Sequence, residues 1–564
     1  MTMPAVHSGE RPAPPGGGPT GQSPTFAPRL LTDLLDNAVA RWGERIAIDF
    51  LGHRWTYGEL GTLVEHAARG LQDIGVKPGD RVGLCLPNMP HYVILYFATL
   101  RIGGIVVNLN PLYVERELCH LLEDSGASVV ATVDIASIHD KVTHVAEKVG
   151  VRKLIVCPLS EALPRFKSIA YRVLKRKEIA HVPHDALHMF FAQLTANHRP
   201  HTPITVAPDD VAVLQYTGGT TGEPKAAMLT HANLTANSAQ MIAHVGHLPD
   251  EQEHTLGVLP LFHVFALTTV LNYSVDTGAE MVLLPRFELK QMVDTVARTQ
   301  CTQLLAVPTI YGALNGLPDS ELAKLKSVRR SISGGAPLPF DVRQRFEARM
   351  GTPVVEGYGL SEASPIITCN PLGKEPKDNS AGPAFPGTTI EIRDLDDPHK
   401  ILPVGERGEI CARGPQIMKG YWNRPDANQE VFVDGALRTG DVGYLDEDGY
   451  LFIVDRMKDM ILCGGYNVYP RTIEEALYEH PAVAEAVVIG VPDTYRGQAP
   501  KAFVSLRPGM AATPEQLRGF LTDKLSKIEM PREIEIRDNL PKTLIGKLSK
   551  KELIAEELAK AAHD

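Results

Sequence analysis

Apolar residues near the start of the chain recur at helical spacing. From Leu30 to Trp42 they fall at intervals that place them on one face of a helix, with polar residues between them. This periodicity predicts an amphipathic helix. A second helix is expected to begin near Tyr57, directly after a short strand that ends in Trp55 and Thr56.

Short apolar runs without this periodicity follow along the chain. They are separated by further helical stretches, which is the pattern of buried strands in a largely parallel sheet wrapped by helices. The alternation therefore predicts an α/β fold. We expect strands at 82–86, 129–133, 154–156, 211–216, 280–284, 303–307 and 354–356.

Two changes of pattern mark smaller units towards the C-terminus. Glycine-rich turns and short alternating strands dominate residues 381–454, which predicts a β-rich subdomain. After Asp455 helices and strands alternate again, which predicts a small α+β domain. We therefore expect an arm at residues 1–28, a large domain at 29–455 and a terminal domain at 456–564.

Composition and charge narrow the class of protein. Hydrophobic residues make up 44% and charged residues 22%, as in an ordinary globular enzyme, and a formal net charge of −10 argues against a nucleic-acid binder. No apolar run reaches the roughly 20 residues that span a bilayer. The proline- and glycine-rich residues 1–28 predict disorder and lack a signal-peptide core. Seven cysteines without metal-ligand spacing favour a reducing cytoplasm.

One basic segment interrupts the α/β pattern. Residues 165–177, RFKSIAYRVLKRK, combine cations with apolar residues at helical intervals. Such a helix can lie on an anionic membrane, in this case the inner face of a membrane. The alternative, and the default for a surface helix, is that the apolar stripe packs on the main body of the protein.

A glycine- and threonine-rich turn carries the first candidate chemistry. Residues 217–225, TGGTTGEPK, follow an apolar strand; the glycines allow a tight turn that aims amide N–H groups inward, and the lysine adds positive charge. This combination suits a polyphosphate, although it is not the G-x-x-x-x-G-K-[ST] loop. The residues proposed to bind phosphate are Thr217, Gly218, Gly219, Thr220, Thr221, Gly222 and Lys225.

Four further segments carry polar or aromatic groups after turns or strands. In residues 356–362, EGYGLSE, Tyr358 offers an aromatic face for a base and Glu362 a carboxylate for Mg²⁺, which prefers oxygen ligands. Asp441 lies in a turn where it can accept hydrogen bonds from ribose hydroxyls. The remaining two segments are 455–470 and 541–547.

Taken together and in this order, these segments resemble the adenylate-forming superfamily of acyl-CoA synthetases, nonribosomal adenylation domains and luciferases. The resemblance covers about residues 30–555 and is closest to the long-chain fatty acid–CoA ligases. Residues 259–267, LPLFHVFAL, and the long stretch 434–470 carry that closer match.

The resemblance implies an activity and a set of roles. The chain would use ATP and Mg²⁺ to convert a fatty acid to an acyl-AMP and then transfer the acyl group to coenzyme A. Lys547, Glu362, Lys225 and His263 would act in catalysis, with Glu362 and Thr217 binding magnesium. The nucleotide and coenzyme A would contact Gly334, Gly335, Ala336, Pro337, Tyr358, Gly359, Ser361, Asp441, Arg456, Lys458, Gly464, Gly465 and Tyr466.

The resemblance also implies that the terminal domain moves. Lys547 would complete the adenylation site and then withdraw as the domain turns about Lys458, so that coenzyme A can enter. A deep apolar tunnel is expected for the acyl chain, with 263–267, 307–311 and Ile332 as candidate walls. We expect a cytoplasmic enzyme with small-molecule substrates and no nucleic acid.

Several alternatives stay open. A medium-chain or aryl acid, or transfer of the acyl group to a carrier protein, fits the same motifs. The sequence departs from the family pattern at Gly219, at Ala226 and Ala227, near Ala436 and Arg438, and at Met457. These departures remove no group that the chemistry requires, but they leave the preferred acid open. The oligomeric state is also open, a homodimer included.

Overall fold

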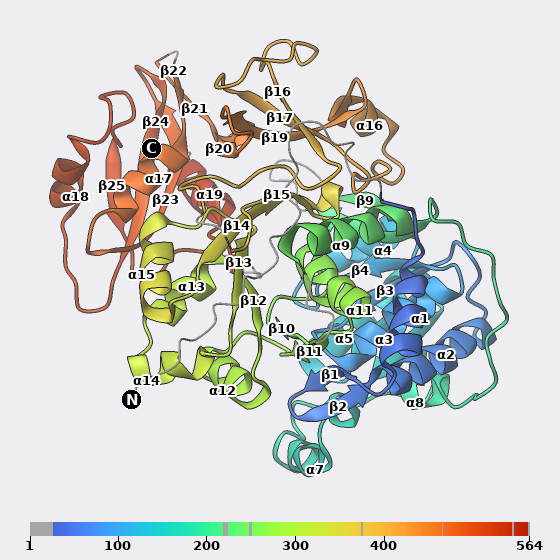
Figure 1. Cartoon of the computed structure of the whole chain (residues 1–564). Coiled ribbons are helices and arrows are strands. Elements are labelled where there is room, and N and C mark those ends of the chain that lie inside the picture. Colours follow the sequence, from blue (N-terminus) through green and yellow to red (C-terminus); the bar gives the residue numbers. More distant parts are fainter. Residues whose placement is uncertain are drawn as a thin grey trace, which may run out of the picture.

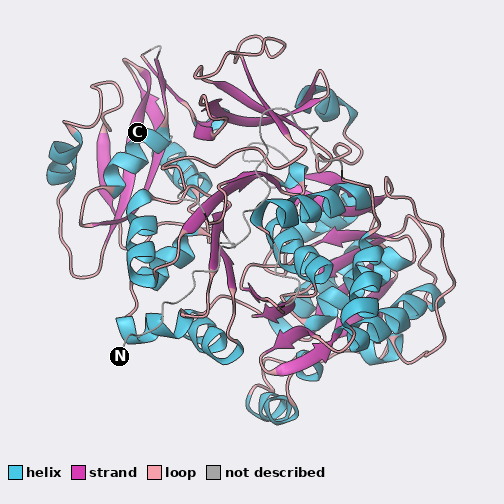
Figure 2. Ribbon diagram, viewed as in Figure 1, coloured by secondary structure: helices cyan, strands magenta, loops and turns pink. Residues whose placement is uncertain are grey.

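The computed structural model describes residues 26–217, 224–246, 251–373, 376–464, 466–543 and 546–561. Within these ranges the strands form four sheets (Figures 1 and 2). Two large, mainly parallel sheets are wrapped by helices, and two smaller sheets follow towards the C-terminus. The α/β fold with a smaller terminal domain, expected from the apolar pattern, is confirmed.

The first large sheet carries the phosphate-loop segment at one edge. Neighbouring strands run parallel, except that the last strand pairs antiparallel with β8, which places Thr217 opposite Lys225. In spatial order the strands are β7 (His188–Phe190), β6 (Lys153–Cys157), β5 (Val129–Val133), β3 (Arg81–Cys85), β4 (Ile105–Asn108), β8 (Val211–Thr217) and β9 (Lys225–Thr230).

The second large sheet is parallel at its centre and antiparallel at both edges. The carboxyl ends of its parallel strands therefore meet at one edge, where α/β proteins commonly bind ligands. In spatial order the strands are β15 (Ile366–Cys369), β14 (Val354–Gly359), β13 (Arg330–Gly334), β12 (Gln303–Ala306), β10 (His254–Gly257), β11 (Glu280–Leu283), β1 (Ile46–Phe50) and β2 (His53–Thr56).

Helices join the two large sheets into one core. Buried apolar residues of both sheets belong to the same continuous cluster, together with residues of α1, α2, α3 and α9. The helices of this part are α1 (Leu31–Trp42), α2 (Tyr57–Asp73), α3 (Pro90–Arg101), α4 (Glu115–Ser125), α5 (Ala136–Val149), α6 (Leu159–Ala162), α8 (Phe191–Leu194), α9 (His231–Val245), α10 (Val264–Ala266), α11 (Tyr273–Thr277), α12 (Leu289–Thr299), α13 (Pro308–Asn315), α14 (Asp319–Leu322) and α15 (Phe340–Met350).

The chain passes from the third sheet to the fourth between Arg456 and Ile461. The third comprises β16 (Thr389–Arg393), β17 (Gly408–Arg413), β18 (Phe432–Val433), β19 (Ala436–Leu445) and β20 (Leu451–Arg456), with α16 (Pro425–Val431) beside it. The fourth comprises β21 (Ile461–Cys463), β22 (Tyr466–Val468), β23 (Val483–Asp493), β24 (Gly497–Leu506) and β25 (Glu533–Ile536), with α17 (Pro470–Tyr478), α18 (Pro514–Leu521) and α19 (Lys550–Ala561).

The fourth sheet has a hydrophobic core of its own. Ile473, Leu477, Val488 and Leu517 lie in one buried cluster, separate from that of the large sheets. An independent core is what a domain needs if it is to move as a unit. The division of the chain at 455–456 stays a prediction.

The basic segment does form a helix, α7 (Arg165–Leu174), but the default expectation for its apolar stripe is wrong. Phe166, Ile169, Val173 and Leu174 are exposed rather than packed on the body. The contact with the body is made instead by Tyr171, which is partly buried against the main core. In the part of the chain that the structure describes, no helix has the length and apolar character required to cross a membrane.

Some predictions fall where the structure gives no description. Most of the predicted arm, residues 1–25, lies outside the described ranges, as do Gly218, Gly219, Thr220, Thr221, Gly222 and Gly465 of the predicted site.

Candidate active site

One cavity of about 2200 Å³ collects most of the predicted site residues that the structure describes. It lies at the carboxyl ends of β8, β13 and β14, where the terminal domain faces the large domain. The predicted residues that line it are Thr217, Lys225, His263, Gly334, Gly335, Ala336, Pro337, Tyr358, Gly359, Ser361, Glu362, Asp441, Arg456, Lys458 and Lys547.

The β8–β9 hairpin presents the ends of the phosphate loop. Thr217 is the last residue of β8 and Lys225 the first of β9, and the Thr217 hydroxyl donates to the Lys225 carbonyl at 3.3 Å. The Lys225 ammonium lies over the ring of Tyr421, 5.5 Å from its centroid. A hairpin anchored at both ends fixes where the intervening loop begins and ends.

Tyr421 also binds Glu362, and no sequence motif predicted a role for Tyr421. Glu362 lies in a short 3₁₀ turn directly after β14, and its carboxylate accepts a 2.7 Å hydrogen bond from the Tyr421 hydroxyl. The backbone N–H of Met418 donates to the Glu362 carbonyl at 2.8 Å. Tyr421 and Glu362 are 59 residues apart. No local spacing of residues predicts such a contact.

The groups around Glu362 fit a magnesium ion. Tyr421 engages only Oε1, and no hydrogen bond from the described residues reaches Oε2. The Glu362 carboxylate and the Thr217 hydroxyl both belong to residues that line the cavity, and both offer the hard oxygen ligands that Mg²⁺ prefers. The proposed ligands are therefore chemically suited to the ion.

A second cluster joins β14 to the third sheet. The Tyr358 hydroxyl donates to Asp441 at 2.5 Å, and the Arg456 guanidinium contacts the other carboxylate oxygen at 3.0 Å. Asp441 and Arg456 face each other across the β19–β20 pairing. Burial, together with the nearby Asp441 charge, raises the pKa of Tyr358, so the phenol stays protonated. The Tyr358 side chain also lines the cavity.

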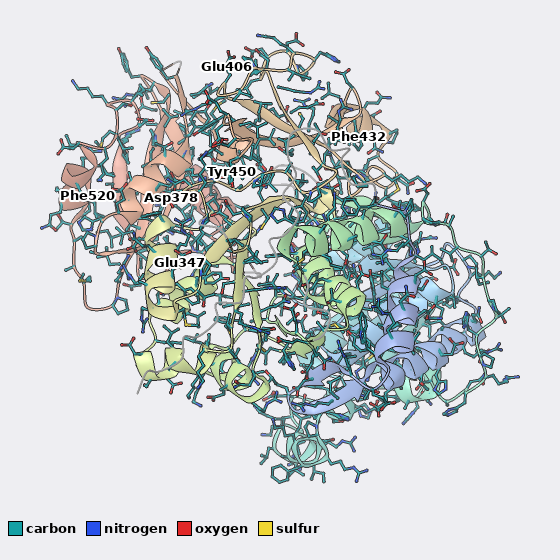
Figure 3. The ribbon with its side chains drawn as sticks, in the orientation of Figure 1. Glu347, Asp378, Glu406, Phe432, Tyr450 and Phe520 are labelled. Atoms are coloured by element: carbon teal, nitrogen blue, oxygen red, sulfur yellow. The ribbon has the colours of Figure 1, made fainter. Side chains whose placement is uncertain are left out.

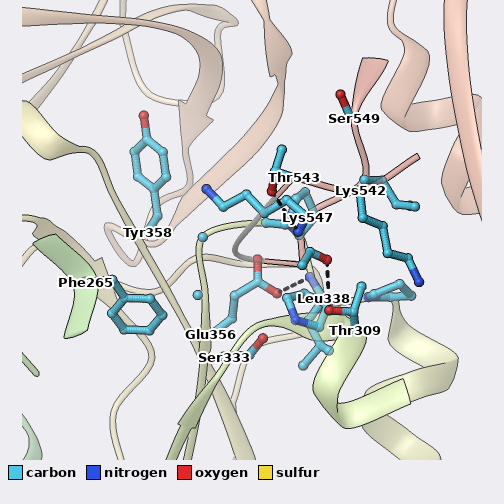
Figure 4. Close-up of a pocket in the computed structure, with 18 of the residues that line it drawn as sticks. Phe265, Thr309, Ser333, Leu338, Glu356, Tyr358, Lys542, Thr543, Lys547 and Ser549 are labelled. Carbon is cyan, nitrogen blue, oxygen red and sulfur yellow. Dashed lines mark hydrogen bonds between the residues drawn. The ribbon is translucent and has the colours of Figure 1, made fainter. Parts of the chain in front are cut away.

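Lys547 reaches this cluster from the terminal domain. Its side chain extends in the direction of Tyr358 and passes close to Gly335 (Figure 4). A Cβ added to Gly335 would lie 2.9 Å from Lys547 Cε, and the φ of +82° also favours glycine there. Gly335, which is predicted to border the nucleotide, therefore also leaves room for the Lys547 side chain.

The turn that carries Lys547 is fixed on both sides of the domain boundary. Within the turn, the backbone N–H of Lys547 donates to the Thr543 hydroxyl at 3.1 Å. Across the boundary, the Thr309 hydroxyl donates to the Gly546 carbonyl at 2.9 Å (Figure 4). Burial and the nearby Arg456 charge lower the pKa of Lys547 to about 8. An anion placed in the cavity would favour the charged form again.

His263 directly precedes α10 as its N-terminal cap and lines the same cavity. Its Nδ1 accepts from the Phe265 backbone N–H at 3.2 Å. Burial and the Lys547 charge lower the pKa of His263 to about 3, so the ring is neutral at physiological pH. A neutral ring that accepts at Nδ1 carries its proton on Nε2, where it can donate to a carboxylate.

The predicted coenzyme A segment lies elsewhere. Neither Gly464 nor Tyr466 is among the described residues that line the cavity, and Tyr466 is 66% exposed. Lys458, by contrast, lines the cavity from the short turn between β20 and β21. In this arrangement Lys547, which is predicted to act in adenylation, lines the cavity, and Gly464 and Tyr466 of the predicted coenzyme A segment do not.

The apolar part of the cavity differs from the predicted wall. His263, Val264, Phe265, Pro308, Thr309 and Ile332 line it, but Leu267, Val307 and Tyr311 are buried in the core instead. Further apolar lining residues come from α9, β12, β15 and one loop, segments that no sequence pattern groups together. They are Met241, Val245, Leu305, Ile366 and Phe385.

Glu356 is another cavity residue without a predicted role. It precedes Tyr358 on β14 and accepts from the Leu338 backbone N–H at 3.2 Å (Figure 4). Burial raises the pKa of Glu356 to about 7, although the Arg471 charge opposes that shift. Its burial within the cavity comes from tertiary packing, so the residue types around it gave no signal.

Family models and known proteins agree with this geometry. The family model of the AMP-binding enzymes matches residues 35–422, and that of the AMP-binding enzyme C-terminal domain matches residues 472–547. A long-chain-fatty-acid–CoA ligase of Bacillus subtilis is 40% identical over 534 residues, covering 94% of this chain and 95% of that protein. A feruloyl-CoA synthase of an Amycolatopsis species is 36% identical, covering 89% and 94%.

Solved structures give the same architecture. ATP-bound MatB of Rhodopseudomonas palustris superposes with a TM-score of 0.80 at 30% identity, covering 93% of this chain and 98% of that one. The anthranilate CoA ligase AuaEII, solved with anthranoyl-AMP, superposes with a TM-score of 0.82 at 25% identity, covering 95% and 98%. The chain therefore belongs to the family of AMP-binding enzymes.

Proposed function

We propose that this chain is an AMP-forming long-chain fatty acid–CoA ligase. The observation that carries the proposal is the convergence of Lys547, Glu362 and the Tyr358–Asp441–Arg456 cluster on one cavity whose lining is partly apolar. The 40% identity to a long-chain-fatty-acid–CoA ligase over nearly the whole chain supports the choice of substrate.

In the first step the fatty acid carboxylate attacks the α-phosphorus of ATP, and pyrophosphate leaves. Both reactants are anionic, so positive charge must be gathered where they meet. Lys547 and Lys225, which both line the cavity, would supply it, while Asp441 and Tyr358 would bind the ribose and the adenine. Mg²⁺, held by Glu362 and Thr217, would neutralise the phosphate charge when bound.

His263 would bind the carboxylate of the acid, and the apolar part of the cavity would bind its hydrocarbon chain. A neutral imidazole with its proton on Nε2 can donate to the carboxylate without adding a charge that would reduce its nucleophilicity. Each methylene that the apolar part of the cavity buries adds at most about 0.8 kcal/mol of transfer free energy. A long chain is therefore favoured over a short one.

In the second step the thiol sulfur of coenzyme A attacks the acyl carbon, and AMP leaves. Lys547 fills part of the cavity, and Gly464 and Tyr466 lie outside it. A turn of the terminal domain about Lys458 would withdraw the lysine and bring that segment in. The separate core of the terminal domain is compatible with such a motion.

The test is a comparison of acids. Pyrophosphate release and thioester formation are measured with acetate, octanoate, palmitate and benzoate, each with and without coenzyme A. We expect kcat/KM to rise by at most about fourfold per added methylene between octanoate and palmitate. A higher kcat/KM for benzoate than for palmitate would contradict the proposal.

Two other activities share the motifs. The feruloyl-CoA synthase relative favours an aryl acid as the second candidate, and the benzoate arm tests it. Transfer to a carrier protein is the third, and it predicts acyl-AMP release without a thioester when coenzyme A is supplied. Magnesium dependence, a cytoplasmic location and peripheral membrane contact remain part of the proposal, and the oligomeric state stays open.

A further inference from the structure

The helix α7 stands apart from the body of the molecule. In Figure 1 it lies beyond β1 and β2, and Figure 3, in the same orientation, draws side chains around it that extend away from the rest of the protein. Phe166 is 82% exposed, and Leu174 is 79% exposed. Large apolar side chains this exposed and this close together are unusual on a monomer surface and mark an interaction site.

The exposed apolar side chains share one face. At about 100° per residue, Phe166, Ile169 and Val173 fall within about 60° of one another around the helix axis. The opposite face is the one that meets the protein, through partly buried Tyr171. Lys167 adds an attachment by donating to the Leu51 carbonyl at 2.8 Å. The helix is therefore held with its apolar face outward.

Positive charge borders this apolar face. Residues 165–177 hold no acidic residue, whereas the whole chain carries a formal net charge of −10. Within that segment Lys175 is the cation that pairs with Glu178, just beyond its end. The cations are Arg165, Lys167, Arg172, Lys175, Arg176 and Lys177, all of them exposed.

We propose that α7 docks the protein on an anionic lipid bilayer. Phe166, Ile169, Val173 and Leu174 enter the boundary between headgroups and acyl chains, and Arg165, Arg172, Arg176 and Lys177 contact lipid phosphates. An amphipathic helix with cations beside a strongly apolar face is suited to this position. A protein partner would need an apolar surface and acidic groups placed to match this one helix. An anionic bilayer presents acyl chains and phosphates everywhere on its surface, so it can meet both the apolar face and the cations.

This proposal deepens the peripheral membrane contact named above, and it rests on a surface separate from the cavity. None of the residues 165–177 lines that cavity. Docking would place the enzyme where long-chain acids concentrate, because these acids partition into bilayers. Membrane binding and catalysis can therefore fail independently in the test.

The test is flotation of the full-length chain with vesicles. One set contains equal parts of phosphatidylglycerol and phosphatidylcholine, and the other contains phosphatidylcholine alone. We expect binding to the anionic set, weakened by added salt because salt screens the attraction. The apolar variant F166S/I169S/V173S and the charge variant R165Q/R172Q/R176Q/K177Q should each bind at least roughly tenfold more weakly.

Matched controls keep the number of changed residues and the change in net charge equal. The apolar control, I401S/V404S/L558S, changes three exposed residues elsewhere. The charge control, K77Q/K148Q/R286Q/K527Q, removes the same number of exposed cations from other surfaces. Both controls should bind like the unmodified chain. All variants should convert octanoate at the unmodified rate, which shows that they are folded.

Two outcomes would overturn the proposal. Equal vesicle binding by the α7 variants and their controls would place the membrane contact elsewhere or exclude it. A lipid-free oligomer that the apolar variant dissociates, measured by sedimentation, would show instead that α7 binds a second copy of the chain. If no acid is converted but the vesicle results hold, the ligase proposal fails and the docking proposal stands.

Discussion

At the scale of single residues, Tyr421 links two charges that the sequence presents as unrelated. Its hydroxyl donates to Glu362, and its ring lies under the Lys225 ammonium. Burial raises the pKa of Tyr421, with the Glu362 charge adding to the shift, so the phenol remains a hydrogen-bond donor at any physiological pH. Tyr421 is therefore expected to position Glu362.

Tyr421→Phe tests that role. The variant keeps the ring under Lys225 and loses only the hydrogen bond to a carboxylate, which typically contributes about 1.5–3 kcal/mol. We expect kcat/KM for pyrophosphate release to fall at least roughly tenfold. The Mg²⁺ concentration needed for half-maximal rate should rise, which a merely structural role would not produce.

Tyr495→Phe serves as the control, because the Tyr495 side chain is 94% exposed and far from these contacts. Unchanged magnesium dependence in Tyr421→Phe would show that Glu362 holds its position without the phenol.

At the scale of elements, a buried charge attaches α12 to the edge of the second sheet. Asp49 on β1 is fully buried and accepts 2.7 Å hydrogen bonds at both oxygens from Arg298 on α12. Arg54, across the β1–β2 pairing, adds a third at 3.1 Å. Burial alone would raise the pKa of Asp49, but the hydrogen bonds from Arg298 and Arg54 outweigh it and lower the pKa.

Arg298→Met should therefore destabilise the fold. Without Arg298, the buried Asp49 carboxylate loses most of the positive charge that offsets its burial. Such a loss costs about 3–5 kcal/mol in fully buried pairs. Because the Arg298 side chain is 39% exposed, we expect a loss of about 2 kcal/mol in the free energy of unfolding. The measurement is denaturant unfolding at pH 7, with exposed Arg116→Met as control. A loss within the error of that control would contradict the expectation.

The same variant has a pH signature. A carboxylate whose pKa is lowered by folding contributes stability that is present above its unfolded pKa, near 3.9, and lost as the pH falls through the folded value. The stability difference between Arg298→Met and the unmodified chain should therefore shrink when unfolding is repeated in acid, from about pH 5 downward.

At the scale of the whole molecule, the position of the terminal domain determines which step the site performs in the proposed mechanism. Thr309 binds the Gly546 carbonyl, and Asp341 of α15 pairs with Arg507 at 2.6 Å, so contacts on both sides hold Lys547 in the cavity. In the proposed mechanism this arrangement serves adenylation, and thioester formation requires these contacts to break.

Lys547→Ala separates the two steps. Pyrophosphate release from ATP and palmitate should fall on the order of 10²–10³-fold, the usual cost of removing one charge-stabilising group. Thioester formation from supplied palmitoyl-AMP and coenzyme A should be nearly unchanged, because the lysine has withdrawn at that step. Equal losses in both half-reactions would refute the two-position mechanism.

Much of the fold and of the site could be predicted from the chain alone. The apolar runs predicted β3, β5, β6 and β8 of the first large sheet and β11, β12 and β14 of the second, because a strand buried on both faces must be apolar throughout. The motifs around Lys225, Glu362, Asp441 and Lys547 identified the chemistry, because phosphate and magnesium demand particular residue types. Both kinds of information are local, so the order of residues was enough.

Only the tertiary structure decided which residues meet. Tyr421 reaches Glu362, Lys547 passes Gly335, and Leu267 and Tyr311 lie in the core rather than on the cavity. The outward face of α7 was decided in the same way, by the packing of Tyr171. The physical reason is common to all of them: the periodicity of a segment says which residues share a face, but only the packing of distant elements determines what that face contacts.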